Sequence, residues 1–163
     1  TFYEALITFY FMRQTGEEHY LVRGESALLK MKEWSRHSDW NFRNKVQLIE
    51  AESYNTQKDF DKAALHYEAS IKSAQEHKFS PDEAIANELA GIFFFERKNY
   101  LKSRAHFAQS IECYEKWGAT IAAGRIRDEI RNKFVSELSD TPATPPPPLS
   151  SKESTSKKRQ LND

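Results

Sequence analysis

The sequence predicts an all-α protein: a right-handed α-solenoid of antiparallel helix pairs, with six or seven helices and a disordered C-terminal tail. Three observations predict this fold. A two-helix pattern occurs twice, forty residues apart. Apolar residues recur at the helical period over residues 2–138. From residue 140 the composition changes to Pro, Ser and Lys, which cannot bury enough apolar area to offset chain entropy. We therefore predict a helical repeat domain over residues 1–139 and a disordered tail over residues 140–163.

The duplicated pattern places small residues opposite aromatic ones. A shift of forty positions aligns Ala51 with Gly91 and Tyr54 with Phe94. Small residues let two helices approach closely, and aromatic rings fill the angle between them. The pattern is tetratricopeptide-like, but the usual tetratricopeptide period is about 34 residues, so we expect longer turns here. The residues expected to pack the repeat are Ala51, Tyr54, Phe60, Ala63, Tyr67, Gly91, Phe94, Tyr100, Ser103 and Phe107.

The first half of the chain predicts four helices. Residues 2–12 are apolar at nearly every position, which predicts a helix that is buried on several sides and ends at Gly16. We expect this helix to pack against a preceding repeat, and the chain to be a fragment of a longer protein. Residues 17–36 form a degenerate earlier copy, followed by a turn over residues 37–41 with Asp39 or Asn41 as N-cap. Residues 42–57 and 59–77 are the helices of the first clear repeat.

The second half predicts three more helices. The run Ser80-Pro81-Asp82-Glu83 indicates a helix start in which Ser80 caps, Pro81 takes the first helical position and Glu83 completes a capping box. Helices over residues 81–97 and 99–117 form the second repeat, which Gly118 closes. A half-polar helix over residues 119–138 then ends the solenoid.

Composition excludes several classes of partner. Lys+Arg and Asp+Glu are both 24, so no net field attracts the chain to nucleic acid or to an acidic membrane. No apolar run is long enough to predict a membrane span. The single cysteine, Cys113, excludes an internal disulfide and fits a small buried side chain in a reducing compartment, so we expect a cytoplasmic protein.

Nothing in the sequence predicts catalysis, a metal, a cofactor or a small-molecule substrate. His66 and His106 occupy equivalent repeat positions, but each is expected to point outward and lacks a second ligand at helical spacing. The five glycines are scattered, so they form no phosphate-binding loop. Cys113 has no histidine nearby in sequence to activate it. We therefore expect no enzyme activity.

A protein or peptide, or a neighbouring domain of a parent chain, is the expected partner. The concave face of such an array comes mainly from the first helix of each pair, and Phe95 is its most prominent aromatic residue. Three consecutive phenylalanines at 93–95 cannot all lie on one helix face, so both internal packing and an apolar anchor for a partner remain open. The candidate partner-binding residues are Leu48, Glu52, Asn55, Ile85, Glu88, Ile92 and Phe95.

Several of these segments also resemble one protein family. Residues 86–91, the aromatic run 93–95, and residues 105–114 and 116–119 are similar to the helical-repeat segment of very large signalling proteins. In that family a serine/threonine-kinase-like domain and an AAA-type NTPase module precede the repeats, and a GAF domain and often a hybrid sensor histidine kinase follow. The likeness covers residues 20–120. Asn44 replaces an expected histidine, and a proline-rich tail follows where the family continues into its sensor.

The resemblance implies a non-catalytic helical scaffold and protein-interaction segment, a fragment of a multidomain signalling kinase or ATPase. Two alternatives remain: a free-standing tetratricopeptide-like adaptor that binds a peptide on its concave face, and a piece of an ATP-dependent sensor kinase. The tail adds two Thr-Pro pairs as phosphorylation candidates, a polyproline stretch at 145–148 that an SH3 or WW domain could dock, and a basic run at 157–159.

Overall fold

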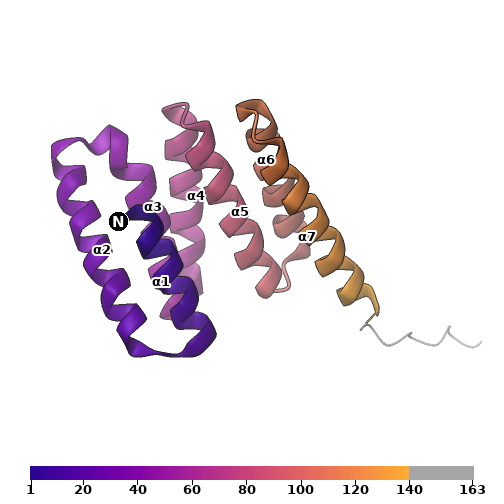
Figure 1. The fold of residues 1–163 in the computed structure, drawn as a ribbon, viewed down its shortest axis with the longest axis horizontal. Coiled ribbons are helices and arrows are strands. Elements are labelled where there is room, and N and C mark those ends of the chain that lie inside the picture. Colours follow the sequence, from indigo (N-terminus) through magenta and orange to yellow (C-terminus); the bar gives the residue numbers. More distant parts are fainter. Residues whose placement is uncertain (140–163) are drawn as a thin grey trace, which may run out of the picture.

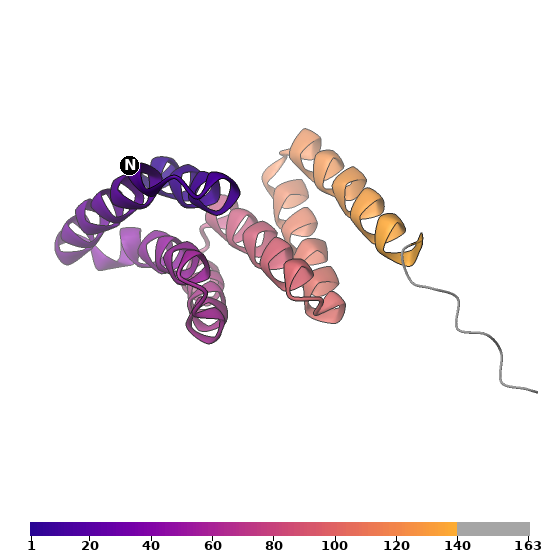
Figure 2. The same ribbon diagram turned by 90° about the horizontal axis from the view of Figure 1, so that it is seen from below.

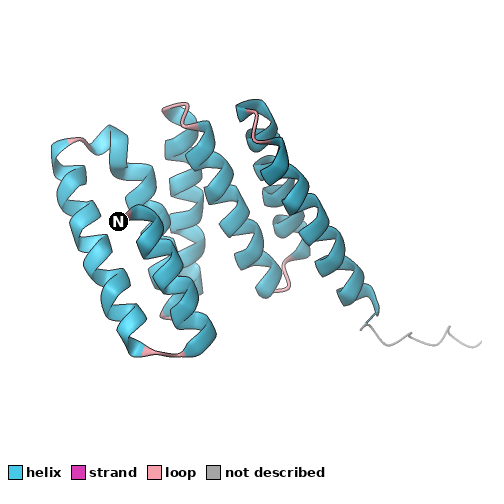
Figure 3. Ribbon diagram, in the orientation of Figure 1, coloured by secondary structure: helices cyan, strands magenta, loops and turns pink. Residues whose placement is uncertain are grey.

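A computed structural model describes the backbone of residues 1–139 and the side chains of residues 1–136. The described residues form seven helices and no strand (Figure 3), so the predicted all-α class is confirmed. The predicted tail, with its phosphorylation, docking and basic motifs, lies outside the described residues. The helices are α1 (Phe2–Thr15), α2 (Glu18–His37), α3 (Asp39–Thr56), α4 (Phe60–Glu76), α5 (Ser80–Glu96), α6 (Tyr100–Trp117) and α7 (Thr120–Ser139).

Successive helices lie side by side in a row that runs from α1 and α2 at one end to α7 at the other (Figure 1). The most extensive contacts join α5 to α6, α3 to α4, and α1 to α2, so neighbours in sequence form pairs. In addition α1 touches α3, and α3 touches α5. The view turned by 90° shows the same order of helices (Figure 2).

The turns between helices recur at intervals of twenty residues. Lys58, Lys78 and Lys98 have φ values of 64, 58 and 58°, and Gly118 has a φ of 86°, all in the left-handed region. At each of these turns, the amide that follows the left-handed residue donates to the carbonyl five residues earlier, as from Asp59 to Tyr54 at 3.0 Å. This is a Schellman-type end, which satisfies carbonyls left open by the helix. The expectation of longer turns is wrong: three residues connect α3 to α4, α4 to α5 and α5 to α6, and the helices fill the rest of the period.

Two of the predicted helix starts are also wrong. α5 begins at Ser80, so the serine lies inside the helix, and Phe79 takes the N-cap position without a side-chain hydrogen bond. α3 begins at Asp39, with Ser38 as N-cap, so the predicted turn over residues 37–41 shrinks to one residue. Side chains cap two other helices. Asp59 accepts from the Lys62 amide at 3.3 Å, and Asn99 accepts from the Lys102 amide at 3.2 Å.

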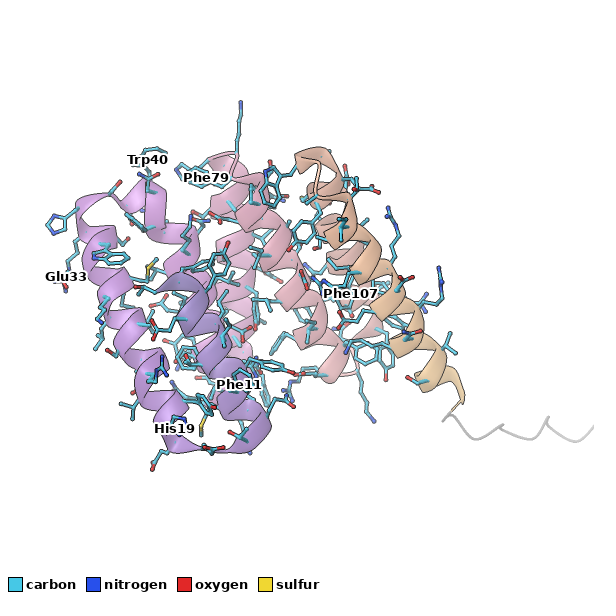
Figure 4. The ribbon with its side chains drawn as sticks, viewed as in Figure 1. Phe11, His19, Glu33, Trp40, Phe79 and Phe107 are labelled. Carbon is cyan, nitrogen blue, oxygen red and sulfur yellow. The ribbon has the colours of Figure 1, made fainter. Side chains whose placement is uncertain are left out.

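Small residues lie against aromatic rings in two of the pairs. A Cβ atom added to Gly91 of α5 would lie 2.8 Å from Phe107 of α6, and one added to Gly24 of α2 would lie 2.9 Å from Phe9 of α1. The small residue is therefore on the first helix in one pair and on the second helix in the other. Figure 4 labels Phe107 among the side chains of the α5–α6 region. Of the residues predicted to pack the repeat, Ala51, Ala63, Tyr67, Gly91, Phe94, Ser103 and Phe107 are buried, and Tyr54, Phe60 and Tyr100 are partly buried.

Candidate protein-interaction surface

Three of the predicted partner-binding residues lie on α3 and are buried within the chain. Leu48, Glu52 and Asn55 are 1, 2 and 4% exposed. The Glu52 carboxylate accepts from the Arg13 guanidinium of α1 at 2.6 Å and also from the Tyr67 hydroxyl of α4. These three residues join α3 to its neighbours, and of the three only Asn55 lines the pocket described below.

Burial keeps the Tyr67 hydroxyl of this network protonated. Desolvation, and then the nearby Glu52 carboxylate, raise the pKa of Tyr67 well above its ordinary value. The phenol therefore stays protonated and donates to Glu52, while Arg13 supplies the compensating charge. Removal of Arg13 would leave the buried Glu52 carboxylate without its charged partner, which is strongly destabilising.

The four predicted residues of α5 are partly exposed, and each has contacts within the chain. The Glu88 carboxylate accepts from the Tyr114 hydroxyl at 3.0 Å and from the Arg125 guanidinium of α7 at 2.7 Å. The Phe95 ring lies 5.1 Å from the Phe134 ring of α7, centroid to centroid. Ile85 and Ile92 pack at the edge of the cluster that joins α5, α6 and α7.

The three consecutive phenylalanines of α5 point to three different neighbours. Phe93 lies 5.1 Å from the Tyr67 ring of α4, and Phe94 stacks on His106 of α6 at 5.3 Å with an angle of 6° between the rings. Phe95 packs on α7, as above. α5 is therefore covered on three sides, and none of the three phenylalanines has to be exposed to solvent. Of the two alternatives left open by the sequence, internal packing holds for Phe93 and Phe94.

A pocket of about 480 Å³ lies where the C-terminal ends of α1, α3 and α5 meet. Its polar groups are held in place by neighbours. Arg13 donates to the Thr56 hydroxyl at 3.1 Å. The Arg97 guanidinium lies 3.6 Å from the centroid of the Phe60 ring and donates to Asn55 at 3.4 Å. The residues that line the pocket are Met12, Arg13, Gln14, Gly16, Asn55, Thr56, Lys58, Phe60, Glu96 and Arg97.

α1 contributes exposed aromatic side chains that the sequence did not assign to a surface. Tyr3, Ile7 and Tyr10 are 61, 54 and 52% exposed, and Phe11 is 41% exposed. Within the described chain only the face of α1 around Ala5, Thr8 and Phe9 is buried, and the expected packing of its other sides against a preceding repeat stays a prediction. In the sequence, the apolar residues on every side of this helix were the signal that could have predicted these exposed side chains. Phe11 lies at the same end of the molecule as His19 and away from Trp40 and Phe79 (Figure 4).

The two histidines at equivalent repeat positions do not point outward as predicted. His66 Nδ1 lies 3.1 Å from a Glu50 carboxylate oxygen, and His106 Nδ1 lies 3.0 Å from the Asn87 amide oxygen. In the described part of the chain, no group of three or more His, Cys, Asp or Glu side chains is placed to hold a metal ion. Burial raises the pKa of the Cys113 thiol to about 11, so this cysteine is a packing residue as predicted.

Among the described helices, none combines the length and apolar character needed to cross a membrane.

Comparison with known proteins gives one partial similarity. The chain is 34% identical over 59 residues to hybrid signal transduction histidine kinase G of Dictyostelium discoideum. The match covers 36% of this chain and 2% of that protein, so the chain corresponds to a small part of this relative. No protein-family model matches the chain. No solved structure matches it either. The similarity and the helical fold are compatible with a segment of a signalling protein.

Proposed function

We propose that the chain is a non-catalytic helical scaffold and protein-interaction segment of a multidomain signalling protein. In this proposal α1–α2, α3–α4 and α5–α6 are tetratricopeptide-like pairs, stacked in a right-handed α-solenoid that α7 ends. The partial similarity to a hybrid histidine kinase supports a signalling parent. The buried thiol of Cys113 fits a cytoplasmic location.

Equivalent contacts forty residues apart support the repeat. Ser70 of α4 donates to the Asn44 carbonyl of α3 at 2.7 Å, and Ser110 of α6 donates to the Ala84 carbonyl of α5 at 2.8 Å. The same offset relates the Asp59 cap to the Asn99 cap. Equivalence of this kind is expected when the two helices of each repeat pack on one another in the same way.

The pocket at the ends of α1, α3 and α5 is the observation that carries the binding role. It is open and combines donors fixed by neighbouring groups, at Arg13 and Arg97, with the apolar ring of Phe60. Its volume lies in the range of pockets that bind small molecules, so it has room for a side chain. We infer that it takes a side chain of a bound peptide or of a neighbouring domain, and that the exposed tyrosines of α1 extend the contact.

Two other parents fit the same segment. A free-standing adaptor would use the same pocket for a peptide, whereas a piece of an ATP-dependent sensor kinase would owe any enzyme activity to other domains of the parent. Kinase-like and NTPase sequence upstream in the reading frame would identify the signalling parent, and a start methionine directly ahead would identify the adaptor. The partial similarity favours the signalling parent.

Peptide binding to the pocket can be measured directly. Twelve-residue peptides selected on the wild-type chain from a random library would be titrated calorimetrically against Arg97→Ala and against Lys72→Ala, an exposed lysine of α4 that lies outside the pocket. We expect Arg97→Ala to weaken binding by about tenfold, which corresponds to about 1.4 kcal/mol, and Lys72→Ala to leave it unchanged. Equal affinities for both folded variants, or failure to select any peptide, would reject the pocket as a binding site.

A further inference from the structure

α1 leaves open the face that α3 and α5 use to pack on the helix pair before them. The left-handed residues Gly16, Lys58 and Lys98 follow the ends of these three helices and set their register. Nine residues before them lie, in the same order, Ile7, Ile49 and Leu89. Five residues before them lie Phe11, Ser53 and Phe93. These two positions define the stacking face of each helix.

In α3 and α5 the stacking face is covered. Ile49 is fully buried in a cluster with Ala27 and Met31 of α2. Phe93 is 2% exposed and packs with Tyr67 of α4, in a cluster that Leu89 also contacts. The preceding pair therefore covers this face in both cases. At Ile49, Leu89 and Phe93 it does so through apolar contacts.

In α1 the same face is partly exposed, with the Phe11 ring stacked on one side against the Tyr20 ring of α2 at 5.4 Å between centroids. Ile7 and Phe11 are 54 and 41% exposed, although each is as large and as apolar as its counterpart in α3 or α5. Glu4 lies twelve residues before Gly16, and the equivalent position of α3, twelve residues before Lys58, is the buried Val46. The Glu4 carboxylate pairs with the Arg23 guanidinium of α2 at 3.0 Å. The open face is thus apolar along its centre, with an ion pair at one edge. A solenoid that continues at this end would bury it.

We propose that Ile7 and Phe11 form the docking surface for a further two-helix unit, which packs on α1 as α1–α2 packs on α3. This inference rests on the stacked-pair arrangement of the proposed function. A second copy of this chain is not the expected occupant, because within the described helices each surface that receives a next helix is covered: α3 packs on α1–α2, α5 packs on α3–α4, and α7 packs on α6 and on Phe95 of α5. The arriving unit must also offer a polar group opposite Glu4 and Arg23.

The α3–α4 unit of this chain is a suitable probe. In the extended chain, a copy of residues 39–82 is joined directly to Thr1. Lys78 of the copy then lies twenty residues before Gly16, which is the same spacing as between Lys78 and Lys98 in the native chain. Ile7→Cys would report burial through the rate of thiol labelling. Leu101→Cys on α6, which is 85% exposed in the native chain, is the matched control. The native Cys113 is 3% exposed and reacts slowly in every variant.

We expect labelling at position 7 to slow by at least tenfold in the extended chain and labelling at position 101 to stay the same. Equal rates at position 7 with and without the added unit would overturn the proposal, and so would an added unit that stays unfolded by circular dichroism. Slower labelling of the unextended chain at high protein concentration would instead show that a second copy covers the face. Peptide binding to the Arg97 pocket is measured on the unextended chain, so its failure is distinguishable from failure of stacking.

Discussion

Lys58, Lys78 and Lys98 each occupy a left-handed backbone conformation at the end of a helix. In this region the Cβ atom of an L-residue meets the following carbonyl, at a penalty of roughly 1–2 kcal/mol, whereas glycine avoids that clash. Glycine loses more backbone entropy on folding, by roughly 0.5–1 kcal/mol. Each substitution of these lysines by glycine should therefore stabilise the fold by about 0.5 kcal/mol, and the triple variant should show a clear rise in the midpoint of urea unfolding.

Lys72→Gly is the matched control for the turn lysines, because Lys72 is an exposed residue in the middle of α4. There glycine relieves no strain, and the variant should lose about 1 kcal/mol. If the turn variants lose stability as Lys72→Gly does, then the left-handed lysines contribute through their charge at the helix ends and not through backbone strain.

His106 should make stability depend on pH. Burial lowers the pKa of His106 below its ordinary value. Asn87 donates to the Glu83 carbonyl at 3.0 Å, which turns its amide oxygen towards His106 Nδ1, so the neutral ring donates there. A folded pKa below the unfolded value of about 6.5 means that this contribution is present above that pH and is lost as pH falls through the folded pKa.

The measurement is urea unfolding at pH 7 and at pH 5 for wild type and His106→Gln. Glutamine can still donate to Asn87, but it does not titrate. The wild type should lose more unfolding free energy over this interval than the variant does. The same loss in both proteins would show that other groups cause the pH dependence.

The α5–α6 contact depends on the absence of a side chain at Gly91. Phe107 is 1% exposed, so its ring cannot move away from an added Cβ atom 2.8 Å from it. Gly91→Ala should destabilise the fold by roughly 1–3 kcal/mol through overpacking. Gly124→Ala in α7 is the control, since a Cβ atom there meets nothing within 4 Å. It should stabilise by about 0.5–1 kcal/mol, because alanine is the better helix former. A neutral Gly91→Ala would show that the helices separate readily.

The sequence predicted the end of a helix correctly where the residue in the turn is itself the cause of the left-handed backbone conformation. Gly118 closes α6 and Gly16 closes α1 as predicted, because glycine adopts the left-handed conformation readily. The lysine turns carried no such signal. Ser80 and Pro81 resembled a cap and a first turn, yet the helix starts one residue earlier. The cap depends on how the turn after α4 enters the helix, and composition does not specify that path.

The sequence predicted the helices that form the candidate surface, but not which residues stay accessible. The repeat placed Glu52 and Asn55 on the concave face by analogy between helices. The structure buries both, because Arg13 of α1 and Arg97, the C-cap residue of α5, reach across to them. Contacts between side chains so far apart in sequence leave no periodic pattern. The pocket that they enclose could not be predicted from the repeat alone.

At the scale of the whole molecule, every extensive contact in the described part of the chain joins helices one or two apart in sequence. Stability in such an array is expected to be a sum of local and nearest-neighbour terms, so damage at one end should stay there. Gly24 and Gly91 allow a matched test near opposite ends. Each lies under a buried ring, and an added Cβ atom would lie 2.9 Å from Phe9 at position 24 and 2.8 Å from Phe107 at position 91.

Hydrogen exchange followed by mass spectrometry would locate the damage. Gly24→Ala should speed exchange in α1 and α2 and leave α5–α7 close to wild type, because neither α1 nor α2 contacts those helices extensively. Gly91→Ala should do the reverse. The described helices bury their apolar residues in three clusters along the row. One cluster joins α1, α2 and α3, and another joins α5, α6 and α7; the cluster around Leu48 and Phe93 joins α3 and α4 to α5 and so connects these two groups of helices. If either substitution speeds exchange equally in all seven helices, that shared cluster makes the molecule one cooperative unit, and the stacked-pair description of its energetics fails.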